Sequence, residues 1–419
     1  MKTIIEIGKA AKAASYKLAA ATTEQKNQAL LNMAEELEKN FDDIMEANTL
    51  DMANAMANDK PKAFLDRLML TEQRIDDMAA GLRALVDLPD PVGNVQRTWT
   101  ATQGIEISKV SVPMGVIGII YEARPNVTAD GAGICLKTGN AVILRGGSDA
   151  INSNLIIGRV LAKGAARAGL PEESVQVVAD TGRETANKMM TLNEYISLLI
   201  PRGGKGLIQS VLQNATVPVI ETGAGNCHVF VDETANLKKA VDIIMNGKIQ
   251  RPAVCNSVES LLVAESIAER ALPVIAEDLS KAKVEIRGCE KAVAILSGNG
   301  FAVQPATEED FYTEYNSLII SIKVVADVNE AVEHINEHGT HHSDCIVTEN
   351  KENAAIFQRG VDSAAVYVNA STRFTDGEQF GFGAEIGIST QKLHARGPMG
   401  LEEMTSYKYL VTGNGQVRN

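Results

Sequence analysis

The fold class is decided by the stretch Val116-Ile117-Gly118-Ile119-Ile120-Tyr121-Glu122-Ala123-Arg124-Pro125-Asn126. Its first six residues form a short apolar run, which predicts a strand buried on both faces. Helical periodicity follows over 127–137, and the apolar run Ala141–Leu144 predicts the next strand. Strand, helix and strand in this order are typical of a parallel sheet in an α/β protein.

The same alternation continues on both sides of this stretch. Apolar periodicity predicts helices over 2–57, 150–168 and 203–213. Because two series of strands follow each other, we expect two α/β domains, each with a mostly parallel sheet, and a seam near 222–232. The other strands of the first series are predicted at Val175–Val178, Ile196–Ile200 and Val217–Ile220, and those of the second at Leu261–Ala264, Ala292–Leu296, Leu318–Val324, Cys345–Val347 and Ala365–Val368.

Two segments instead alternate between apolar and polar residues. Residues 97–112, broken at Gly104, predict a hairpin, and residues 406–412 predict an edge strand. Strand edges left open by a fold can pair with another chain. We therefore expect the hairpin and the tail to form an oligomerisation element of a homo-oligomer. The segment 377–387 is rich in glycine, and we expect it to be a loop.

Composition excludes several classes of protein. The chain carries 40 Lys and Arg against 53 Asp and Glu, and this net charge of −13 argues against a nucleic-acid partner, which requires a basic surface. The start, Met1 to Glu6, lacks the apolar core of a signal peptide, and Val116–Tyr121 is too short to span a membrane. The five cysteines are widely spaced and odd in number, which suits a reducing compartment. The expectation is a cytoplasmic protein without a membrane partner.

Cys255 is the cysteine best placed for chemistry. It follows Pro252, which ends a predicted helix, and it precedes the strand at Leu261–Ala264. A catalytic thiol has to be ionised, and the nearby Arg251 can favour the thiolate. The competing interpretation is a buried structural thiol, which is the commoner role of a free cysteine.

Two polar residues stand where predicted strands end. Asn126 opens a helix, so its amide can donate to an oxyanion, or it can simply cap the helix. Glu221 follows the predicted strand Val217–Ile220 and precedes glycines. A carboxylate at that end of a parallel strand is suited to acid–base chemistry, although a solvated acid is the plainer interpretation.

Two glycine-rich turns are candidates for binding phosphate. They are Arg145-Gly146-Gly147-Ser148 and Arg202-Gly203-Gly204-Lys205, and each follows a predicted strand and precedes a helix. Backbone N–H groups and a cation at a helix start suit a phosphate, but an ordinary strand-to-helix turn has the same composition. Neither turn matches a dinucleotide fingerprint or a P-loop.

The segment His334-Ile335-Asn336-Glu337-His338 matches the H-x-x-E-H pattern of some zinc peptidases. Gly339 follows directly, so the motif falls in the last turn of a helix, where histidines are favoured by the helix dipole. We therefore expect no metal site there.

The order of these motifs resembles the aldehyde dehydrogenase superfamily. Pro125-Asn126 ends a strand, Thr138–Arg145 and Glu221-Thr222-Gly223 follow, and Cys255 comes next. The amino-acid sequences of three longer segments resemble those of one branch of that superfamily, the branch that reduces γ-glutamyl phosphate. These segments are Gly247–Asn256, Phe374–Gly387 and His394–Glu403.

This resemblance implies a fold, a reaction and roles. It implies an aldehyde-dehydrogenase-like fold in which 1–96 and 113–225 bind NADP, 226–389 carry Cys255, and 97–112 with 390–419 form the oligomerisation element. L-glutamyl 5-phosphate is reduced by NADPH to L-glutamate 5-semialdehyde and phosphate, in the second step of proline biosynthesis. Cys255 is the nucleophile, Asn126 and the Cys255 N–H hold the oxyanion, and Glu221 either carries a proton or orients Cys255.

The resemblance also assigns binding residues. Glu314 grips the nicotinamide ribose, Arg145 stands at the adenosine ribose, and Ser148 replaces a glutamate common in NAD-preferring relatives, which favours NADPH. Glutamate 5-kinase, which makes the acyl phosphate, is a candidate transient partner. Further cofactor residues are Gly146, Arg202, Gly203 and Gly204, and the cations offered to substrate carboxylate and phosphate are Arg124, Arg251, Arg373, His394 and Arg396.

Three alternatives remain beside this interpretation. They are a hydrolytic aldehyde dehydrogenase, a zinc peptidase built on His334 and His338, and a non-catalytic scaffold of the same fold. Dependence on phosphate, bound zinc, and the effect of alkylating Cys255 separate them.

Overall fold

The computed structural model describes residues 2–418 and leaves out the side chains of Ala63 and Lys205. Its contacts divide the chain into two units. Unit 1 comprises Met1–Thr222, Gly381–Gly387 and Met399–Asn419, and unit 2 comprises Gly223–Phe380 and Ile388–Pro398.

The apolar stretch at 116 is the central strand of unit 1. Strand β3 (Val116–Tyr121) is buried along its whole length and pairs in parallel with β4 (Ala141–Gly146) and β6 (Leu198–Arg202). With β5 (Val175–Val177) the order is β5-β4-β3-β6, so the parallel sheet is confirmed. After β3 the chain adds β4 and then β5 on one side of β3, and it later adds β6 on the opposite side, so the strand order reverses at β3. Ligands of open α/β sheets bind beyond the carboxyl ends of strands at such a reversal.

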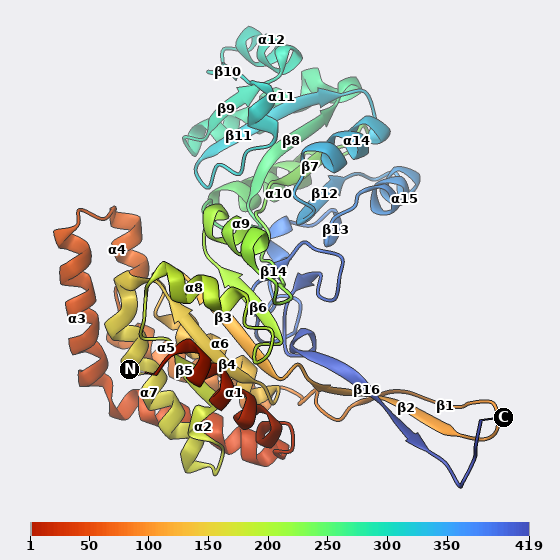
Figure 1. Cartoon of the computed structure of the whole chain (residues 1–419). Coiled ribbons are helices and arrows are strands. Elements are labelled where there is room, and N and C mark those ends of the chain that lie inside the picture. The colour runs from red at the N-terminus through yellow and green to blue at the C-terminus, as the bar shows by residue number, and fades with distance from the viewer. Residues whose placement is uncertain (1, 419) are drawn as a thin grey trace. The chain divides into compact units, whose positions relative to one another are not determined.

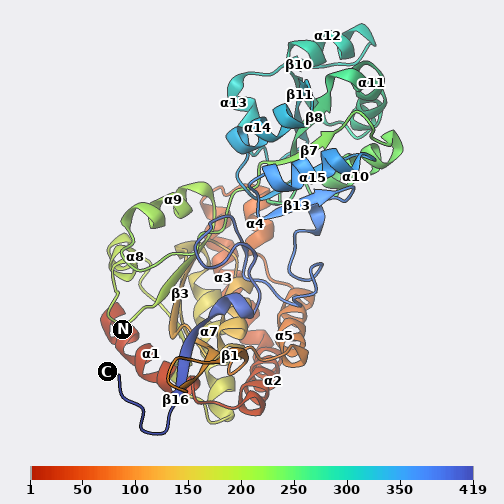
Figure 2. The same ribbon diagram turned by 90° about the vertical axis from the view of Figure 1, so that its right-hand side faces the viewer.

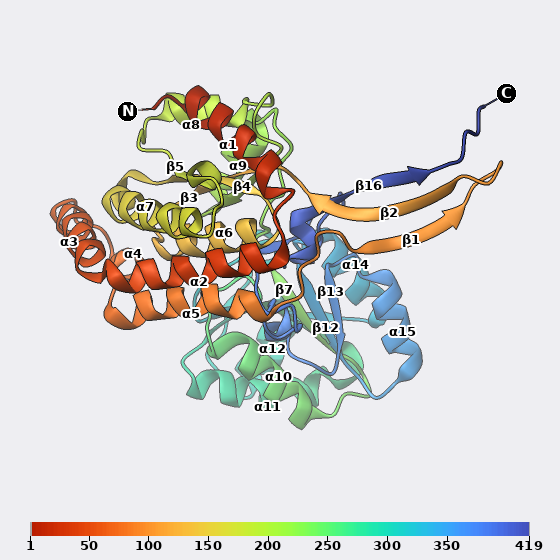
Figure 3. The same cartoon turned by 90° about the horizontal axis from the view of Figure 1, so that it is seen from below.

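Helices cover both faces of this sheet. Figure 3 shows α1, α8 and α9 on one face and α2, α5, α6 and α7 on the other. Gly164 lets α7 approach α2 closely, because a Cβ there would lie 2.6 Å from the Cα of Met33. The helices are α1 (Ile4–Leu18), α2 (Thr23–Lys39), α3 (Phe41–Ala57), α4 (Lys62–Leu68), α5 (Glu72–Asp87), α6 (Asn126–Lys137), α7 (Ile151–Arg167), α8 (Arg183–Met190) and α9 (Lys205–Asn214), with 3₁₀ turns η1 (Ser148–Ala150), η2 (Glu172–Ser174) and η4 (Glu402–Met404).

The predicted hairpin and tail strand are confirmed and form one antiparallel sheet. β1 (Val95–Thr100) pairs with β2 (Glu106–Pro113), and β16 (Thr405–Thr412) pairs with the other edge of β2. Figure 1 shows this three-stranded sheet extending away from the helices of unit 1. Tyr407, Tyr409 and Leu410 on β16 are each about half exposed.

Unit 2 contains a seven-stranded parallel sheet in the order β10-β9-β11-β8-β7-β12-β13. Helices α10, α11 and α12 pack along one face, and α14 and α15 pack together on the other (Figure 2). The strands of this sheet are β7 (Cys227–Val231), β8 (Val258–Ala264), β9 (Glu285–Gly288), β10 (Gln304–Pro305), β11 (Ile319–Val325), β12 (Ser343–Val347) and β13 (Ala365–Val368). A separate antiparallel pair is formed by β14 (Ile388–Ser389) and β15 (Gly397–Pro398). The helices are α10 (Leu237–Ile249), α11 (Glu265–Lys281), α12 (Glu290–Gly298), α13 (Glu308–Phe311), α14 (Val328–His338), α15 (Lys351–Gly360) and the 3₁₀ turn η3 (Thr372–Phe374).

Two strand predictions are wrong. Ala292–Leu296 lies in helix α12, because Ala292 and Leu296 are four residues apart and bury one helical face. Val217–Ile220 is no regular strand and makes a single bridge, Val219 with Leu199. Pro218 has no N–H to donate within that segment. The sequence analysis did not predict strands β7 and β9, nor the two-residue strands β10, β14 and β15.

Of the helices formed by residues 2–418, none has the length and apolar character needed to cross a membrane.

Candidate active site

Three candidate residues follow β3 at the carboxyl end of the unit 1 sheet. Arg124 and Asn126 are exposed, and Asn126 is the first residue of helix α6. Pro125 takes the N-cap position, so the interpretation of Asn126 as the cap is wrong. The Asn126 amide instead donates to Asp130 Oδ2 at 3.0 Å.

The turn after β6 lies beside the end of β3. Arg202 accepts a hydrogen bond from the Glu122 N–H at 3.2 Å, and Gly203 and Gly204 are exposed. A Cβ on Gly203 would lie 2.7 Å from Leu207 Cδ2 and 2.8 Å from Glu122 Cδ, so a larger residue there requires those side chains to move. The turn therefore presents backbone at the start of α9, as a phosphate site requires.

The turn after β4 combines a half-buried cation with exposed backbone. Arg145 Nη2 donates to the carbonyl of Thr181 at 2.5 Å, while its buried Nε has no hydrogen-bond partner among the described residues. Burial lowers the pKa of Arg145, and Asp180 opposes this. A Cβ on Gly146 would collide with the amide of Asn154, and Ser148 is exposed at the start of η1.

Glu221 lies in the loop that follows the single bridge at Val219, and its side chain is half-buried. The next residue, Thr222, is anchored by a 3.0 Å hydrogen bond from its hydroxyl to the carbonyl of Pro201. Arg124, Asn126, Arg145, Arg202 and Glu221 all belong to unit 1, whereas Cys255 belongs to unit 2.

Cys255 occupies the turn between α10 and β8, so the predicted junction of helix and strand is confirmed. Its side chain is half-buried. Its carbonyl accepts a hydrogen bond from the thiol of Cys227 at 3.2 Å. A Cβ on Gly225 would collide with that same carbonyl oxygen and lie 2.6 Å from the Cys255 Cα. Gly225, just before β7, and Cys227, its first residue, therefore fix the backbone of Cys255 from one side.

Asn256 and Arg373 fix the turn from the other side. The Asn256 amide donates to the carbonyl of Thr375 at 2.9 Å, and its oxygen accepts from Arg373. The pKa of Arg373 is lowered by burial and by Arg251, while a Cys255 thiolate acts in the opposite sense. Because this coupling is reciprocal, the guanidinium favours the thiolate form of Cys255.

Glu314 is brought into the same neighbourhood. Its Oε1 accepts a 2.8 Å hydrogen bond from the N–H of Gly225, the residue that packs against Cys255. Glu314, Arg251, Arg373 and Cys255 thus gather in unit 2.

A buried ion pair close to this site was not predicted. Lys248 Nζ lies 2.5 Å from Glu259 Oε2, and both side chains are fully buried. Burial raises the pKa of Glu259 and lowers that of Lys248, and their attraction opposes both shifts. The only signal in the sequence is a glutamate inside the apolar strand that follows Cys255. Removing one partner strands a buried charge, which typically costs 3–5 kcal/mol.

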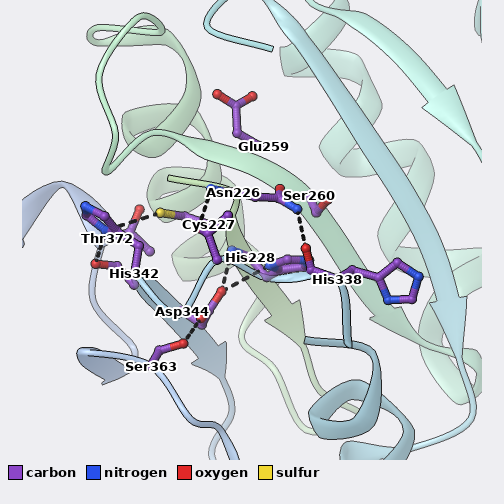
Figure 4. A network of polar contacts seen from close by, with 12 residues as sticks. Asn226, Cys227, His228, Glu259, Ser260, His338, His342, Asp344, Ser363 and Thr372 are labelled. Atoms are coloured by element: carbon purple, nitrogen blue, oxygen red, sulfur yellow. Dashed lines mark hydrogen bonds and ion pairs between the residues drawn. The ribbon is translucent and has the colours of Figure 1, made fainter. Parts of the chain in front are cut away.

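Figure 4 shows the buried polar network that surrounds strand β7. The Asn226 amide donates to the carbonyl of His338, and the backbone N–H of His228 donates to Asp344 at 2.7 Å. Asp344 also accepts from Ser363 at 2.5 Å. The network joins β7 to β12. It thereby holds in place the strand whose first residue, Cys227, donates to the carbonyl of Cys255.

His394 and Arg396 lie apart from these residues in sequence and differ in environment. His394 is exposed with a left-handed backbone, φ 71°. Arg396 Nη2 donates to the carboxylate and the carbonyl of Asp362, both at 2.9 Å. Arg396 is therefore already paired with an acid, whereas its buried Nε has no hydrogen-bond partner among the described residues.

The H-x-x-E-H segment ends helix α14 as predicted, and both histidines are engaged. His334 Nδ1 lies 3.1 Å from Lys323 Nζ, and His338 Nε2 lies 2.8 Å from Glu308. Across residues 2–418, no three histidine, cysteine or acidic side chains are arranged to hold a metal ion.

We expect His342 to make unfolding depend on pH. Burial lowers the pKa of this side chain to about 4, whereas an unfolded histidine titrates near 6.5. Its stabilising contribution is thus complete above pH 6.5 and is lost as the pH falls towards 4. Lowering the pH from 7.5 to 5 should therefore reduce the free energy of unfolding by about 2 kcal/mol through the protonation of His342 in the unfolded chain.

Urea unfolding at the two pH values measures this effect. In His342→Gln the pH-dependent loss should shrink by that amount, whereas the neighbouring variant His341→Asn should behave as wild type. Asparagine tolerates the left-handed backbone of residue 341, φ 60°. Equal pH dependence in wild type and His342→Gln contradicts the prediction.

Comparison with known proteins shows the family to which the chain belongs. The aldehyde dehydrogenase family profile matches residues 2–295. A protein of Caldanaerobacter subterraneus subsp. tengcongensis named gamma-glutamyl phosphate reductase is 58% identical over 410 residues, 98% of both chains. One of Clostridium botulinum (strain Eklund 17B / Type B) with the same name is 58% identical over 418 residues, 100% of both chains.

Solved structures give the same result. The crystal structure of gamma-glutamyl phosphate reductase from Thermotoga maritima has a TM-score of 0.97 at 51% identity and covers 100% of both chains. An acetylating aldehyde dehydrogenase from Geobacillus thermoglucosidasius shares the fold, with a TM-score of 0.69 at 17% identity over 99% of this chain and 97% of that one. The chain therefore belongs to the aldehyde dehydrogenase family and, within it, to the γ-glutamyl phosphate reductases.

Proposed function

We propose that the chain reduces L-glutamyl 5-phosphate with NADPH to L-glutamate 5-semialdehyde and phosphate, the second step of proline biosynthesis from glutamate. The observation that carries this proposal is the turn at Cys255. A half-buried thiol is held there by Gly225 and Cys227 on one side and by Asn256 and Arg373 on the other. The names of full-length relatives that are 58% identical supply the substrate.

The residues of the chain divide the reaction into two steps. The Cys255 thiolate attacks the acyl carbon and phosphate leaves, which produces a thioester. We assign stabilisation of the oxyanion to Asn126 and to the Cys255 N–H. After the reduction, the carbon–sulfur bond breaks and Cys255 returns as the thiolate. Arg373 favours that thiolate at both stages. We assign the same effect to Arg251, which is four residues before Cys255 in the sequence.

We assign the remaining candidate residues to the substrate and to proton transfer. Binding of the phosphate and the carboxylate of the substrate is assigned to five basic side chains, Arg124, Arg251, Arg373, His394 and Arg396. Glu221 either carries a proton or orients Cys255. Water is an unwanted acceptor in this reaction, so a water-activating role for Glu221 is not proposed.

Members of the aldehyde dehydrogenase family use NAD or NADP, and the residues of unit 1 fit such a dinucleotide. An engineered glycolyl-CoA reductase of the same fold, with a TM-score of 0.69 at 18% identity, has bound NADP⁺. Here the unsatisfied Arg145 Nε and the exposed backbone of Gly203 and Gly204 offer donors to it. Gly146 and Arg202 complete the two turns, and Glu314 is assigned to the nicotinamide ribose. When bound, the dinucleotide supplies the hydride that reduces the thioester.

We expect Ser148→Glu to shift preference from NADPH towards NADH. The exposed Ser148 lies at the turn assigned to the adenosine ribose, and a carboxylate there opposes the 2′-phosphate of NADPH. The ratio of NADPH to NADH affinity should fall roughly ten- to hundredfold. Titration with each dinucleotide measures it, with the neutral Ser148→Gln as control. An unchanged ratio in Ser148→Glu contradicts the assignment.

The reverse reaction tests the proposed function. Glutamate 5-semialdehyde with NADP⁺ should yield NADPH only when phosphate is present, because phosphate is the acceptor of the acyl group. Formation of NADPH without phosphate identifies a hydrolytic aldehyde dehydrogenase instead.

We also propose a cytoplasmic homo-oligomer. All five cysteines are free thiols, as in a reducing compartment. The open edges of β1 and β16, with half-exposed Tyr407 and Tyr409, suit pairing between subunits. A transient contact with glutamate 5-kinase is proposed because that enzyme makes the acyl phosphate.

A further inference from the structure

Glu122 is the acidic residue at the centre of the proposed dinucleotide site. It comes directly after β3, which lies between β4 and β6 in the sheet. The two glycine-rich turns follow those neighbouring strands. A Cβ on Gly147 would lie 3.8 Å from Glu122 Cα, and one on Gly203 would lie 2.8 Å from Glu122 Cδ. The residue therefore stands between both turns.

The carboxylate of Glu122 already binds the turn before α9. Its Oε2 accepts a 3.1 Å hydrogen bond from the N–H of Gly204, the N-cap residue of that helix. Both carboxylate oxygens also lie 4.0 Å from the position of a Cβ on Gly204. A second hydrogen bond, from the Glu122 N–H to the carbonyl of Arg202, holds the backbone in place.

This arrangement puts a negative charge where a phosphate is expected to bind. The start of a helix attracts anions because its first N–H groups point outward and carry partial positive charge. Gly204 has no side chain that could accept from these N–H groups. The acceptor is instead the side chain of Glu122, which lies 82 positions earlier in the sequence. In the free protein the carboxylate stabilises this helix start as a phosphate does.

We propose that Glu122 is an affinity-determining residue that competes with the pyrophosphate of the dinucleotide for the N-terminus of α9. The inference rests on the proposed function, because it requires the chain to bind NADPH. For the pyrophosphate to reach the Gly204 N–H, the Glu122 carboxylate has to leave it, and the remaining negative charge opposes the incoming phosphates. Dinucleotide binding is weakened in consequence, and release of the spent dinucleotide after each turnover is faster.

The test is the affinity of full-length Glu122→Gln for three probes: NADPH, NADH and 2′-AMP. Glutamine keeps an oxygen that can accept from Gly204 but carries no charge. We expect Glu122→Gln to bind NADPH and NADH two- to tenfold more tightly than wild type, as a charge at a helix start implies. Binding of 2′-AMP, which has a 2′-phosphate but no pyrophosphate, should not change. Glu106→Gln on strand β2 is the control, because it alters the net charge equally at an exposed position.

The other outcomes decide against the inference. Unchanged affinity in Glu122→Gln makes the carboxylate a helix cap only, and weaker affinity makes it a contact of the bound dinucleotide. Tighter binding of 2′-AMP moves the competition to the 2′-phosphate. If wild type binds neither dinucleotide, the proposed function fails and this inference fails with it. Thermal unfolding of each variant shows separately whether loss of the cap lowers stability.

Discussion

Replacing Cys255 by serine is expected to lower phosphate-dependent turnover by roughly 10⁴-fold or more. A hydroxyl at this position is hardly ionised at neutral pH, so it cannot attack an acyl phosphate as a thiolate does. The volume of the side chain barely changes, and the contacts from Gly225, Cys227 and Asn256 involve its backbone or its neighbour. The variant should therefore fold and bind NADPH as wild type does.

Turnover is measured in both directions, and dinucleotide affinity is measured by titration. Cys289→Ser is the matched control, since Cys289 is another half-buried thiol of unit 2 and lies at the start of α12. Cys289→Ser should retain activity. If Cys255→Ser keeps more than a tenth of wild-type turnover, Cys255 is not the nucleophile.

Local patterns in the sequence are sufficient to predict several of the elements that carry the site. The apolar run Val116–Tyr121 and the alternation at 97–112 correspond to β3 and to the β1–β2 hairpin, because burial and period-two alternation leave a direct trace in residue order. Cys255 was likewise placed correctly between helix and strand, since Pro252 marks the end of α10.

The errors arose where residue order does not determine the structure. Ala292–Leu296 is a short apolar run that suits a strand or a buried helix equally, and its packing selects the helix. Val217–Ile220 has strand-like composition, but Pro218 removes the N–H that a regular ladder needs.

The contacts that shape the site were also beyond prediction, because they join distant segments. The carboxylate of Glu122 meets Gly204 across 82 positions, and the thiol of Cys227 meets the Cys255 carbonyl across 28. Nothing local in the sequence indicates which polar groups become partners when strands of one sheet align. The pair Lys248 and Glu259 is closer in sequence, yet only the fold shows that both are fully buried.

Replacing Gly225 by alanine is expected to lower turnover by about a hundredfold or more, although the added group is a single methyl. The new Cβ would collide with the carbonyl oxygen of Cys255 and lie 2.6 Å from its Cα. Both are backbone atoms, so no side chain can rotate away and the turn itself has to move. Displacement of a reacting group by about 1 Å can cost a hundredfold in rate. The N–H of residue 225 also donates to Glu314, so the shift reaches the proposed ribose ligand.

Gly298→Ala is the matched control, since Gly298 ends helix α12 in the same unit and an added Cβ there would have no atom within 4 Å. It should retain turnover and stability. Gly225→Ala should also alkylate more slowly or more rapidly at Cys255 than wild type, which reports the displaced thiol independently of substrate. Thermal unfolding separates this effect from general destabilisation. If Gly225→Ala matches wild type in turnover and in alkylation rate, close packing of residue 225 is not what positions the nucleophile, and Asn256 with Arg373 must hold the turn alone.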